Sequence, residues 1–216
     1  MRISQRHKFI FFAFPKTGSE AVRFVLNPLS DVRGQTAEDV SLRDGELILP
    51  THIGPREFAA FSRGHGLRFD GYFRFMFVRN PWSRLVSLYR MLRTKRPLFP
   101  MTFLEWLAIA RPDGAGGVVL DEPDQRWLRY GAYSVDAFAG PKERRLVDRV
   151  YRMEDMALAI ADLKQRGIAI PFDHAPTRNT RGPVDLNEYY PTSAARDTVA
   201  SRYAKDIAEF RYHYPG

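Results

Sequence analysis

The chain has 216 residues, of which 44% are hydrophobic and 27% charged, values typical of a globular protein and not of a disordered or collagen-like chain. It contains no cysteine, which excludes a disulfide framework, a thiolate nucleophile and a cysteine-ligated zinc site. Lysine and arginine number 33 against 25 acidic residues, and this net charge of +8 favours anionic partners. No apolar run reaches the ~20 residues of a membrane-spanning helix, and the run after the basic first residues is too short for a secretory signal. We therefore expect a cytoplasmic protein with no membrane span.

The first part of the chain predicts a strand, a turn and a helix. Residues 9–14 form a continuous apolar run, which is typical of a strand buried on both faces. Residues 15–19 interrupt this run, and apolar residues then recur at helical spacing until Asn27-Pro28 ends the helix. A polar, loop-rich stretch follows. It contains a short apolar segment that predicts a strand at 47–49, before a short helix at 55–61.

A second strand and a long helix are predicted next. Residues 71–78 are rich in aromatic side chains and indicate a strand. Asn80 is a favoured N-cap and Pro81 a favoured first helical residue, so we expect a helix to begin there. Its buried stripe is marked by apolar residues at helical spacing, namely Leu85, Leu88, Tyr89 and Leu92.

The remaining elements complete an alternating pattern. A strand is predicted at 149–152, and helices are predicted at 101–110, 125–130, 154–166 and 193–210. Strands that alternate with helices predict an α/β fold with a central, mainly parallel sheet flanked by helices. The length favours a single domain, residues 1–216.

The first predicted turn has the chemistry of an anion site. Residues 15–19 supply the Lys16 cation, the hydroxyls of Thr17 and Ser19, and Gly18, which allows close backbone approach. The free N–H groups and the dipole of the helix start add to these donors. The spacing G-x-x-x-x-G-K-[ST] is absent, which disfavours an ordinary Walker-type NTPase. The alternative is a tight turn with a solvent-facing lysine.

The second turn offers a different set of donors. Arg79 ends the predicted strand, where its planar guanidinium can bind a phosphate through two hydrogen bonds, and Ser87 lies two helical turns beyond the cap. The alternatives are a surface ion pair for Arg79 and a solvated helix face for the basic run around it. That run has no acidic residue and comprises Arg79, Arg84, Arg90, Arg93, Lys95 and Arg96.

Both turns resemble elements of one enzyme family. Residues 14–19 resemble the 5′-phosphosulfate loop of sulfotransferases that use 3′-phosphoadenylyl sulfate (PAPS), and residues 77–89 resemble their 3′-phosphate element. The order and separation are most similar to carbohydrate sulfotransferases of the Golgi type and their bacterial relatives. Weaker similarity at 151–156, 178–180 and 203–212 extends the resemblance over most of the chain, although only the two phosphate elements are specific.

The resemblance implies a P-loop-like nucleotide-binding sulfotransferase fold and a transfer of the sulfuryl group from PAPS to a hydroxyl of a carbohydrate or glycolipid. By this analogy the 5′-phosphosulfate is bound by Lys16, Thr17, Gly18 and Ser19, and the 3′-phosphate by Arg79 and Ser87. Lys16 would also stabilise the negative charge on the departing phosphate during in-line displacement. No metal is expected, because the sequence has no H-E-x-x-H motif, no closely spaced histidine pair and no cysteine.

The acceptor hydroxyl needs a general base, and the chain has five histidines. His52 follows a predicted strand and resembles the histidine that acts as base in uronosyl-type carbohydrate sulfotransferases. The ordinary pKa of histidine, near 6.5, suits proton transfer at neutral pH. The alternative is a surface or hydrogen-bonding role for His52. His65 is the second candidate and is more typical of a loop residue, whereas the others are expected to be structural or exposed: His7, His174 and His213.

Several other residues have two open interpretations. Glu154 could approach the site, as the acidic residue of the family does there, or interact with a helix dipole. Arg178 and Arg181 could reach the phosphate of the nucleotide or an acidic acceptor, or belong to a solvated loop. The tryptophans, Trp82, Trp106 and Trp127, are expected in the core, and no separate adenine-binding motif is evident.

Two other function classes compete with the sulfotransferase interpretation. An ATP-dependent small-molecule kinase would need the missing Walker spacing or a D-x-D-like metal motif. A non-enzymatic nucleic-acid-binding module would use the basic surface of residues 84–96 and bind with steep salt dependence. Against it, this helix is expected to be half buried and no RNA-binding aromatic signature is present. We therefore expect a hydroxyl-bearing glycan partner, which could be acidic, and no nucleic acid.

Overall fold

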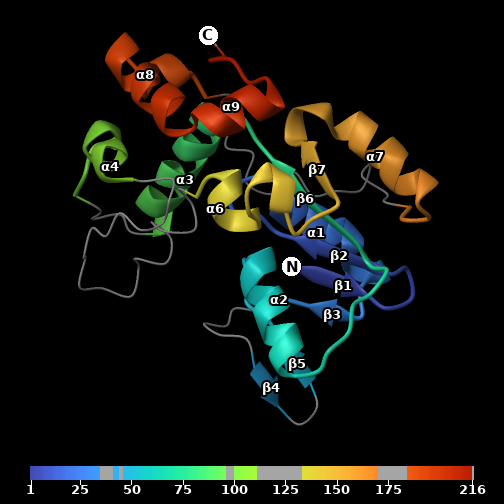
Figure 1. Ribbon diagram of the computed structural model, residues 1–216. Helices are drawn as coiled ribbons and strands as arrows, with labels where there is room; N and C mark the ends of the chain where they lie inside the picture. The colour runs from blue at the N-terminus through green and yellow to red at the C-terminus, as the bar shows by residue number, and fades with distance from the viewer. Residues whose placement is uncertain (35–40, 44–45, 96–99, 111–132, 170–183, 216) are drawn as a thin grey trace. The chain divides into compact units, whose positions relative to one another are not determined.

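The computed structural model describes residues 1–34, 41–43, 46–95, 100–110, 133–169 and 184–215. Contacts within the chain divide it into two compact units. Unit 1 consists of Met1–Val78 and Phe138–Asn179, and unit 2 of Arg79–Ala137 and Thr180–Gly216. Figure 1 labels the helices and strands of both units.

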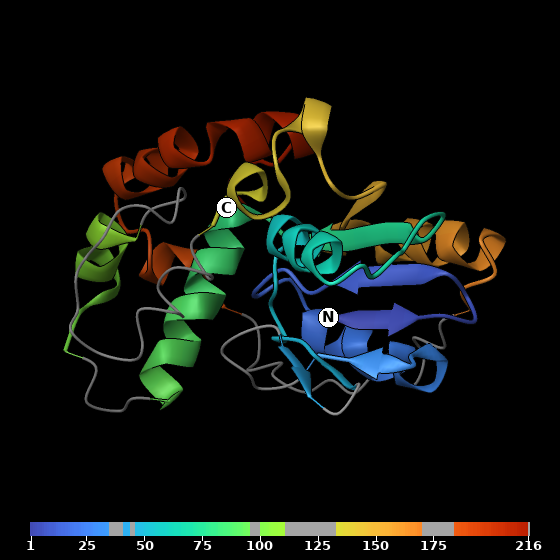
Figure 2. The ribbon, with the colours of Figure 1, turned by 60° about the horizontal axis from the view of Figure 1, so that its bottom comes forward.

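Unit 1 is built on a five-stranded sheet with the strand order β3-β1-β2-β6-β7. Its strands are β1 (Arg2–Ser4), β2 (Phe9–Phe12), β3 (Val32–Arg33), β6 (Phe73–Val78) and β7 (Arg149–Arg152). β2, β6 and β7 run parallel to one another, whereas β1 is antiparallel to both β2 and β3. Figure 2 shows these strands side by side. The parallel core and its flanking helices confirm the predicted α/β fold class.

One face of the sheet is covered by α1 (Ser19–Leu26) and α7 (Met156–Gln165). Successive side chains of a strand point to opposite faces, so alternate residues of β2 and β6 share this face. The resulting core is fully buried and includes Phe9, Phe11, Phe75, Phe77, Val22, Val25, Ala159 and Leu163. The apolar stripe at helical spacing in α1 therefore has the role that the sequence predicted.

The opposite face of the sheet is buried as well. Phe12 lies 5.8 Å from Phe58 of α2 (Pro55–Gly64), measured between ring centroids. Phe14 lies 4.8 Å from Phe138 of α6 (Val135–Ala139). Burial of β2 on both faces confirms the interpretation of the continuous apolar run at 9–14, although the strand itself ends at Phe12.

The short strand predicted at 47–49 is present one residue earlier, as β5 (Glu46–Ile48). It pairs antiparallel with β4 (Ser41–Arg43) in a separate two-stranded sheet. Short 3-10 turns complete unit 1: η1 (Asn27–Leu29), η2 (Lys142–Arg144) and η3 (Met153–Asp155).

Unit 2 is helical in the part that the structure describes. Its elements are α3 (Pro81–Lys95), α4 (Phe103–Ile109), η5 (Leu186–Glu188), α8 (Ser193–Arg202) and α9 (Ala204–Phe210). Thr102 and Glu105 form a reciprocal capping box at the start of α4. The core of this unit is aromatic, because Trp106 packs against Tyr89 and Phe103 at centroid distances of 5.8 Å. Trp82 and Trp106 are buried as expected, and Trp127 lies outside the described residues.

Several predicted bounds differ from the structure. The closing helix predicted at 193–210 breaks into α8 and α9 at Tyr203, whose ring is 1% exposed. The helix predicted at 154–166 begins at Met156, after η3, and the one predicted at 125–130 lies outside the described residues. β1, β3 and α6 were not predicted, because two to five residues are too few to show a period. Every helix in the described ranges is too short or too polar to span a bilayer.

Candidate functional site

The turn after β2 adopts an unusual backbone conformation. Lys16 has a φ of 64° and Gly18 a φ of 65°, and both values belong to the left-handed region. Only a few per cent of non-glycine residues adopt positive φ, so the conformation of Lys16 is imposed by its surroundings. A Cβ at Gly18 would also lie 2.4 Å from Cε of Met153, so the end of that side chain would have to move. The left-handed backbone and the position of the Met153 side chain therefore both favour glycine at this position.

The two hydroxyl residues of this turn have different surroundings. Thr17 is fully buried, and its hydroxyl donates a hydrogen bond of 2.8 Å to the carbonyl oxygen of Phe14. Ser19 is 5% exposed and is the first residue of α1. The first N–H groups of a helix have no partner within the helix, so the start of α1 presents donors at the end of the turn. The hydroxyl of Thr17 therefore stabilises the turn itself. The backbone donors at the start of α1 belong to the same turn region as the half-buried Lys16 side chain.

His52 is anchored beside this turn. Its Nδ1 lies 2.7 Å from the carbonyl oxygen of Ala13, the first residue after β2. Since a carbonyl oxygen can only accept, Nδ1 carries the proton and Nε2 is the basic nitrogen of the ring. The side chain is half-buried.

The surroundings of His52 lower its pKa to about 3. Burial is the largest cause, and the positive charges of the Met1 amino group, Arg23 and Lys16 add to it, whereas the hydrogen bond to Ala13 opposes the change. His52 is therefore neutral at neutral pH. Its electrostatic interaction with Lys16 and its contact with Ala13 associate His52 with the turn at residues 15–19.

The second predicted element begins with a well-formed helix cap. Oδ1 of Asn80 accepts hydrogen bonds from the backbone N–H groups of Trp82 (3.1 Å) and Ser83 (3.5 Å). Nδ2 of Asn80 donates to the carbonyl oxygen of His213 at 2.7 Å, and the side chain is 7% exposed. These contacts confirm the prediction that Asn80 caps the helix that starts at Pro81.

Arg79 directly precedes the Asn80 cap, and Ser87 lies further along α3. Both side chains are half-buried. Arg79 directly follows Val78, the last residue of β6. Ser87 is seven positions after Asn80, close to two turns at 3.6 residues per turn, so Ser87 lies above the cap on the same side of α3. Of the predicted site residues, unit 1 contains Lys16, Thr17, Gly18, Ser19 and His52, and unit 2 contains Arg79 and Ser87.

The basic run of α3 is not a continuous surface. Arg84 is only 1% exposed, Arg90 is half-buried and Arg93 is exposed. The burial of Arg84 agrees with the expectation that this helix is half buried, and it counts against the continuous basic surface that a nucleic-acid-binding module would use at residues 84–96. A count of charges in the sequence does not distinguish the buried side of a helix from its solvated side.

The other candidate residues have varied positions. His65 directly follows α2, is exposed, and stacks on Phe61 at a centroid distance of 4.0 Å. Glu154 is exposed within η3. His174, Arg178 and Arg181 lie outside the described residues. No group of three or more histidine, aspartate or glutamate side chains in the described ranges is placed to hold a metal ion.

Two contributors to the site were not predicted. The carbonyl of Ala13, which fixes His52, is a backbone group and leaves no signal in the sequence. Arg23 lies one helical turn after Ser19, donates to the carbonyl oxygen of Ser19 at 3.2 Å and lowers the pKa of His52. The feature of the sequence that could have identified Arg23 as a contributor to the site is its position one turn into the predicted helix.

Comparison with known proteins identifies the family of this chain. A family model described as the sulfotransferase family matches residues 1–213, a range that includes both turns, His52 and Ser87. Searches of curated proteins and of solved structures gave no match. Because the family match spans nearly the whole sequence, the chain belongs to the sulfotransferase family.

Proposed function

We propose that this sulfotransferase transfers the sulfuryl group of PAPS to a hydroxyl group of a carbohydrate or glycolipid acceptor. We further propose that residues 1–216 act as one sulfotransferase domain. The observation that carries the proposal is the left-handed turn after β2, where Lys16 precedes the start of α1 and His52 is anchored alongside. This combination offers a cation, backbone donors and a neutral imidazole in one region of unit 1.

Lys16, Thr17, Gly18 and Ser19 bind the 5′-phosphosulfate in this proposal. Successive backbone N–H groups in such turns form anion-binding concavities, and the positive end of the α1 dipole favours the same charge. Thr17 contributes its backbone N–H, because its hydroxyl proton is already donated to Phe14. The Lys16 ammonium stabilises the negative charge that develops on the 5′-phosphate as the S–O bond breaks.

Arg79 and Ser87 bind the 3′-phosphate, the group that distinguishes PAPS from ordinary adenylates. In support, Arg79 follows β6, which is the parallel neighbour of β2. The carboxyl ends of neighbouring parallel strands meet at the same edge of a sheet, where ligands of α/β proteins bind. The guanidinium can bind a phosphate through two hydrogen bonds, and the Ser87 hydroxyl adds a third donor.

His52 accepts the proton of the acceptor hydroxyl at Nε2 in this proposal. The acceptor oxygen forms its bond to sulfur while the bond between sulfur and the bridging oxygen breaks, so the proton goes to His52 and the electron pair to the phosphate. The low pKa of His52 in the free protein makes it a weak base. Anionic groups bound near Lys16 and Arg23 would offset the part of that lowering which these two cations cause.

A binding experiment tests the nucleotide assignment. Thermal unfolding is measured with adenosine 3′,5′-bisphosphate, with ATP and Mg²⁺, and with an oligonucleotide. A ligand at about 100 times its Kd stabilises the fold by roughly 2.7 kcal/mol, and we expect this effect from the bisphosphate. Stabilisation by ATP and Mg²⁺ alone would favour a kinase, and stabilisation by the oligonucleotide alone a nucleic-acid-binding module. Either result would contradict the proposal.

A second experiment tests the acceptor and the base. Glycan and glycolipid pools are incubated with PAPS and the protein, and sulfated products are identified by mass spectrometry. His52→Ala should lower turnover by about 10²- to 10⁴-fold, the usual contribution of a general base, and leave bisphosphate binding unchanged. Lost binding with intact turnover would rule out His52 as the base.

A further inference from the structure

Arg84 is a charged side chain in the interior of unit 2. It belongs to α3, is 1% exposed, and donates a hydrogen bond of 2.5 Å to the carbonyl oxygen of Tyr133. Its guanidinium lies over the ring of Tyr203, 5.6 Å from the centroid. Burial lowers the pKa of Arg84, and Tyr203 and Asp206 oppose that lowering, so the two groups interact electrostatically with the guanidinium.

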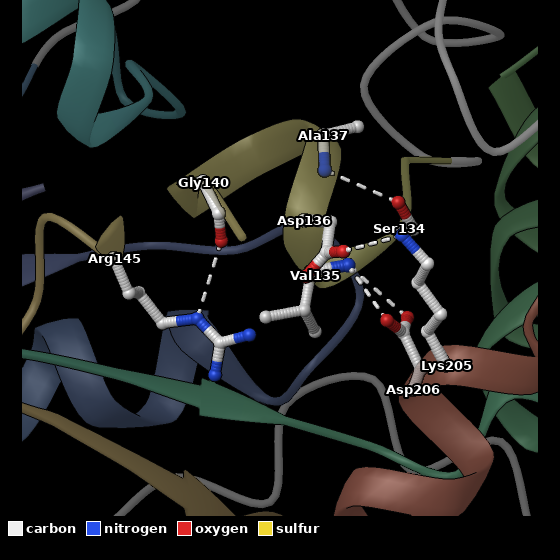
Figure 3. Close-up of polar contacts among 8 residues, drawn as sticks. All are labelled: Ser134, Val135, Asp136, Ala137, Gly140, Arg145, Lys205 and Asp206. Carbon is white, nitrogen blue, oxygen red and sulfur yellow. Dashed lines mark hydrogen bonds and ion pairs between the residues drawn. The ribbon is translucent and has the colours of Figure 1, made fainter. Parts of the chain in front are cut away.

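Asp206 is the buried acidic partner on α9. Its carboxylate is 5% exposed, and both oxygens lie 3.1 Å from the backbone N–H of Val135. Figure 3 shows this contact, together with the hydrogen bond from the N–H of Ala137 to the Ser134 hydroxyl. The Arg84–Asp206 pair therefore connects α3, the segment around Val135, and α9.

A buried charge pair of this kind contributes little net stability. Desolvation of two ions costs about as much as their attraction returns, so replacement of both by uncharged groups is often neutral or stabilising. Loss of one partner is far more harmful, because the other charge remains buried and uncompensated. The pair is therefore better suited to fixing one arrangement of α3 than to raising the free energy of unfolding.

The position of Arg84 on α3 indicates which residues its contacts could hold in place. Arg84 lies five residues after Arg79 and three before Ser87, between the two residues assigned to the 3′-phosphate. Its contacts with Tyr133 and Tyr203 therefore act on the first turns of the helix that carries Ser87. We propose that Arg84 and Asp206 are positioning residues, which hold Arg79 and Ser87 in the arrangement that recognises the 3′-phosphate. This inference rests on the proposed function.

The test compares two nucleotides that differ only in the 3′-phosphate. The Kd of adenosine 3′,5′-bisphosphate and of adenosine 5′-phosphate is measured for the wild type and for Asp206→Asn, together with the melting temperature. Asparagine can still accept the hydrogen bond from Val135, so the substitution removes chiefly the charge. We expect Asp206→Asn to lower the preference for the bisphosphate about tenfold, which corresponds to about 1.4 kcal/mol.

A double variant separates positioning from stability. Arg84→Met combined with Asp206→Asn removes both charges, and it should recover most of the melting temperature lost in the single variant. We expect its preference for the bisphosphate to stay low, because the anchor of α3 is absent. This variant also carries the test if Asp206→Asn alone does not fold. A double variant that regains both stability and preference would overturn the proposal.

Asp136→Asn is the matched control. Asp136 lies beside Val135 and pairs with the exposed Lys205 at 3.4 Å (Figure 3), so its removal breaks a neighbouring ion pair at the surface. We expect no change in nucleotide preference. An equal loss in Asp136→Asn and Asp206→Asn would refute a specific role of the buried pair. If the wild type itself does not prefer the bisphosphate, the assignment of Arg79 and Ser87 is wrong, and the positioning role that rests on it is overturned with it.

Discussion

The two units stabilise their predicted anion-binding elements in different ways. In unit 1 the turn at Lys16 depends on backbone conformation, with positive φ at Lys16 and Gly18, and on a histidine that burial keeps neutral. In unit 2 the helix that carries Ser87 also carries the buried Arg84, which interacts electrostatically with the buried Asp206. The turn in unit 1 is maintained against backbone strain, whereas the helix in unit 2 is maintained against the free-energy cost of burying charge. Substitutions in the two units should therefore differ in which property they change.

For the two anion-binding elements, the larger effect is expected for Lys16→Met in unit 1. Loss of the ammonium removes the group that stabilises charge on the departing phosphate, and loss of one such donor typically lowers kcat by about 10²- to 10³-fold. The measurement is kcat and Kd for PAPS with the same acceptor. A large rise in Kd with unchanged kcat would mean that Lys16 binds the substrate without stabilising the transition state.

Arg79→Ala in unit 2 should weaken nucleotide binding, in contrast to Lys16→Met, which should lower kcat. Removal of a guanidinium that holds a phosphate through two hydrogen bonds should cost about 2–3 kcal/mol, which corresponds to a Kd about 30- to 150-fold higher for adenosine 3′,5′-bisphosphate. Isothermal titration calorimetry measures this change, and Arg93→Ala, on an exposed part of α3, is the matched control. Equal losses in the two variants would indicate a general electrostatic effect and not a 3′-phosphate site.

The third prediction uses pH to contrast the units. The pKa of His52 is lowered from 6.5 to about 3, so between these values the unfolded state binds more protons and stability falls as pH falls. The pKa of Asp206 is raised from 3.8 to about 6, mainly by burial and against the effect of Arg84, so stability rises as pH falls in that window. From pH 7 to pH 5, we expect each group to contribute about 1–2 kcal/mol, with opposite signs.

Two variants isolate these contributions. His52→Asn keeps an N–H that can donate to Ala13 but cannot titrate, and Asp206→Asn removes the titrating carboxyl of unit 2. Urea unfolding at pH 7 and pH 5 gives the change in the free energy of unfolding. Acidification should stabilise His52→Asn relative to the wild type and destabilise Asp206→Asn. Changes of the same sign in the two variants would contradict the opposite electrostatic environments of the units.

The sequence predicts the elements that have a strong local signal. The doubly buried β2, the cap at Asn80 and the helical stripe of α3 follow from apolar period and capping chemistry, and the structure confirms each. The left-handed conformation at Gly18 agrees with the glycine in that turn. These features depend on neighbours within a few residues, which is why the sequence is sufficient for them.

The features that could not be predicted from the sequence depend on partners that are far away along the chain. The anchor of His52 is a carbonyl 39 residues away, and Asp206 accepts from a backbone N–H 71 residues away. The burial of Arg84 cannot be told from its basic neighbours, because the ring of Tyr203 beneath it and the charge of Asp206 have no local signature in the sequence. Long-range contacts of this kind decide the pKa values and thus the chemistry, whereas the local pattern decides only the elements.

The smallest expected effect concerns the strain at Gly18. Gly18→Ala places a Cβ 2.4 Å from Cε of Met153 at a φ of 65°, whereas Gly71→Ala has a similar φ of 73° and nothing within 4 Å. The Gly71 variant therefore measures the cost of the left-handed conformation alone, about 1 kcal/mol in the free energy of unfolding. We expect Gly18→Ala to cost about 1 kcal/mol more, because Met153 must move, and Met153→Ala in the same chain to recover that difference. Equal destabilisation of the two single variants would mean that the Met153 side chain moves away without cost. Glycine would then be required at position 18 by backbone strain alone.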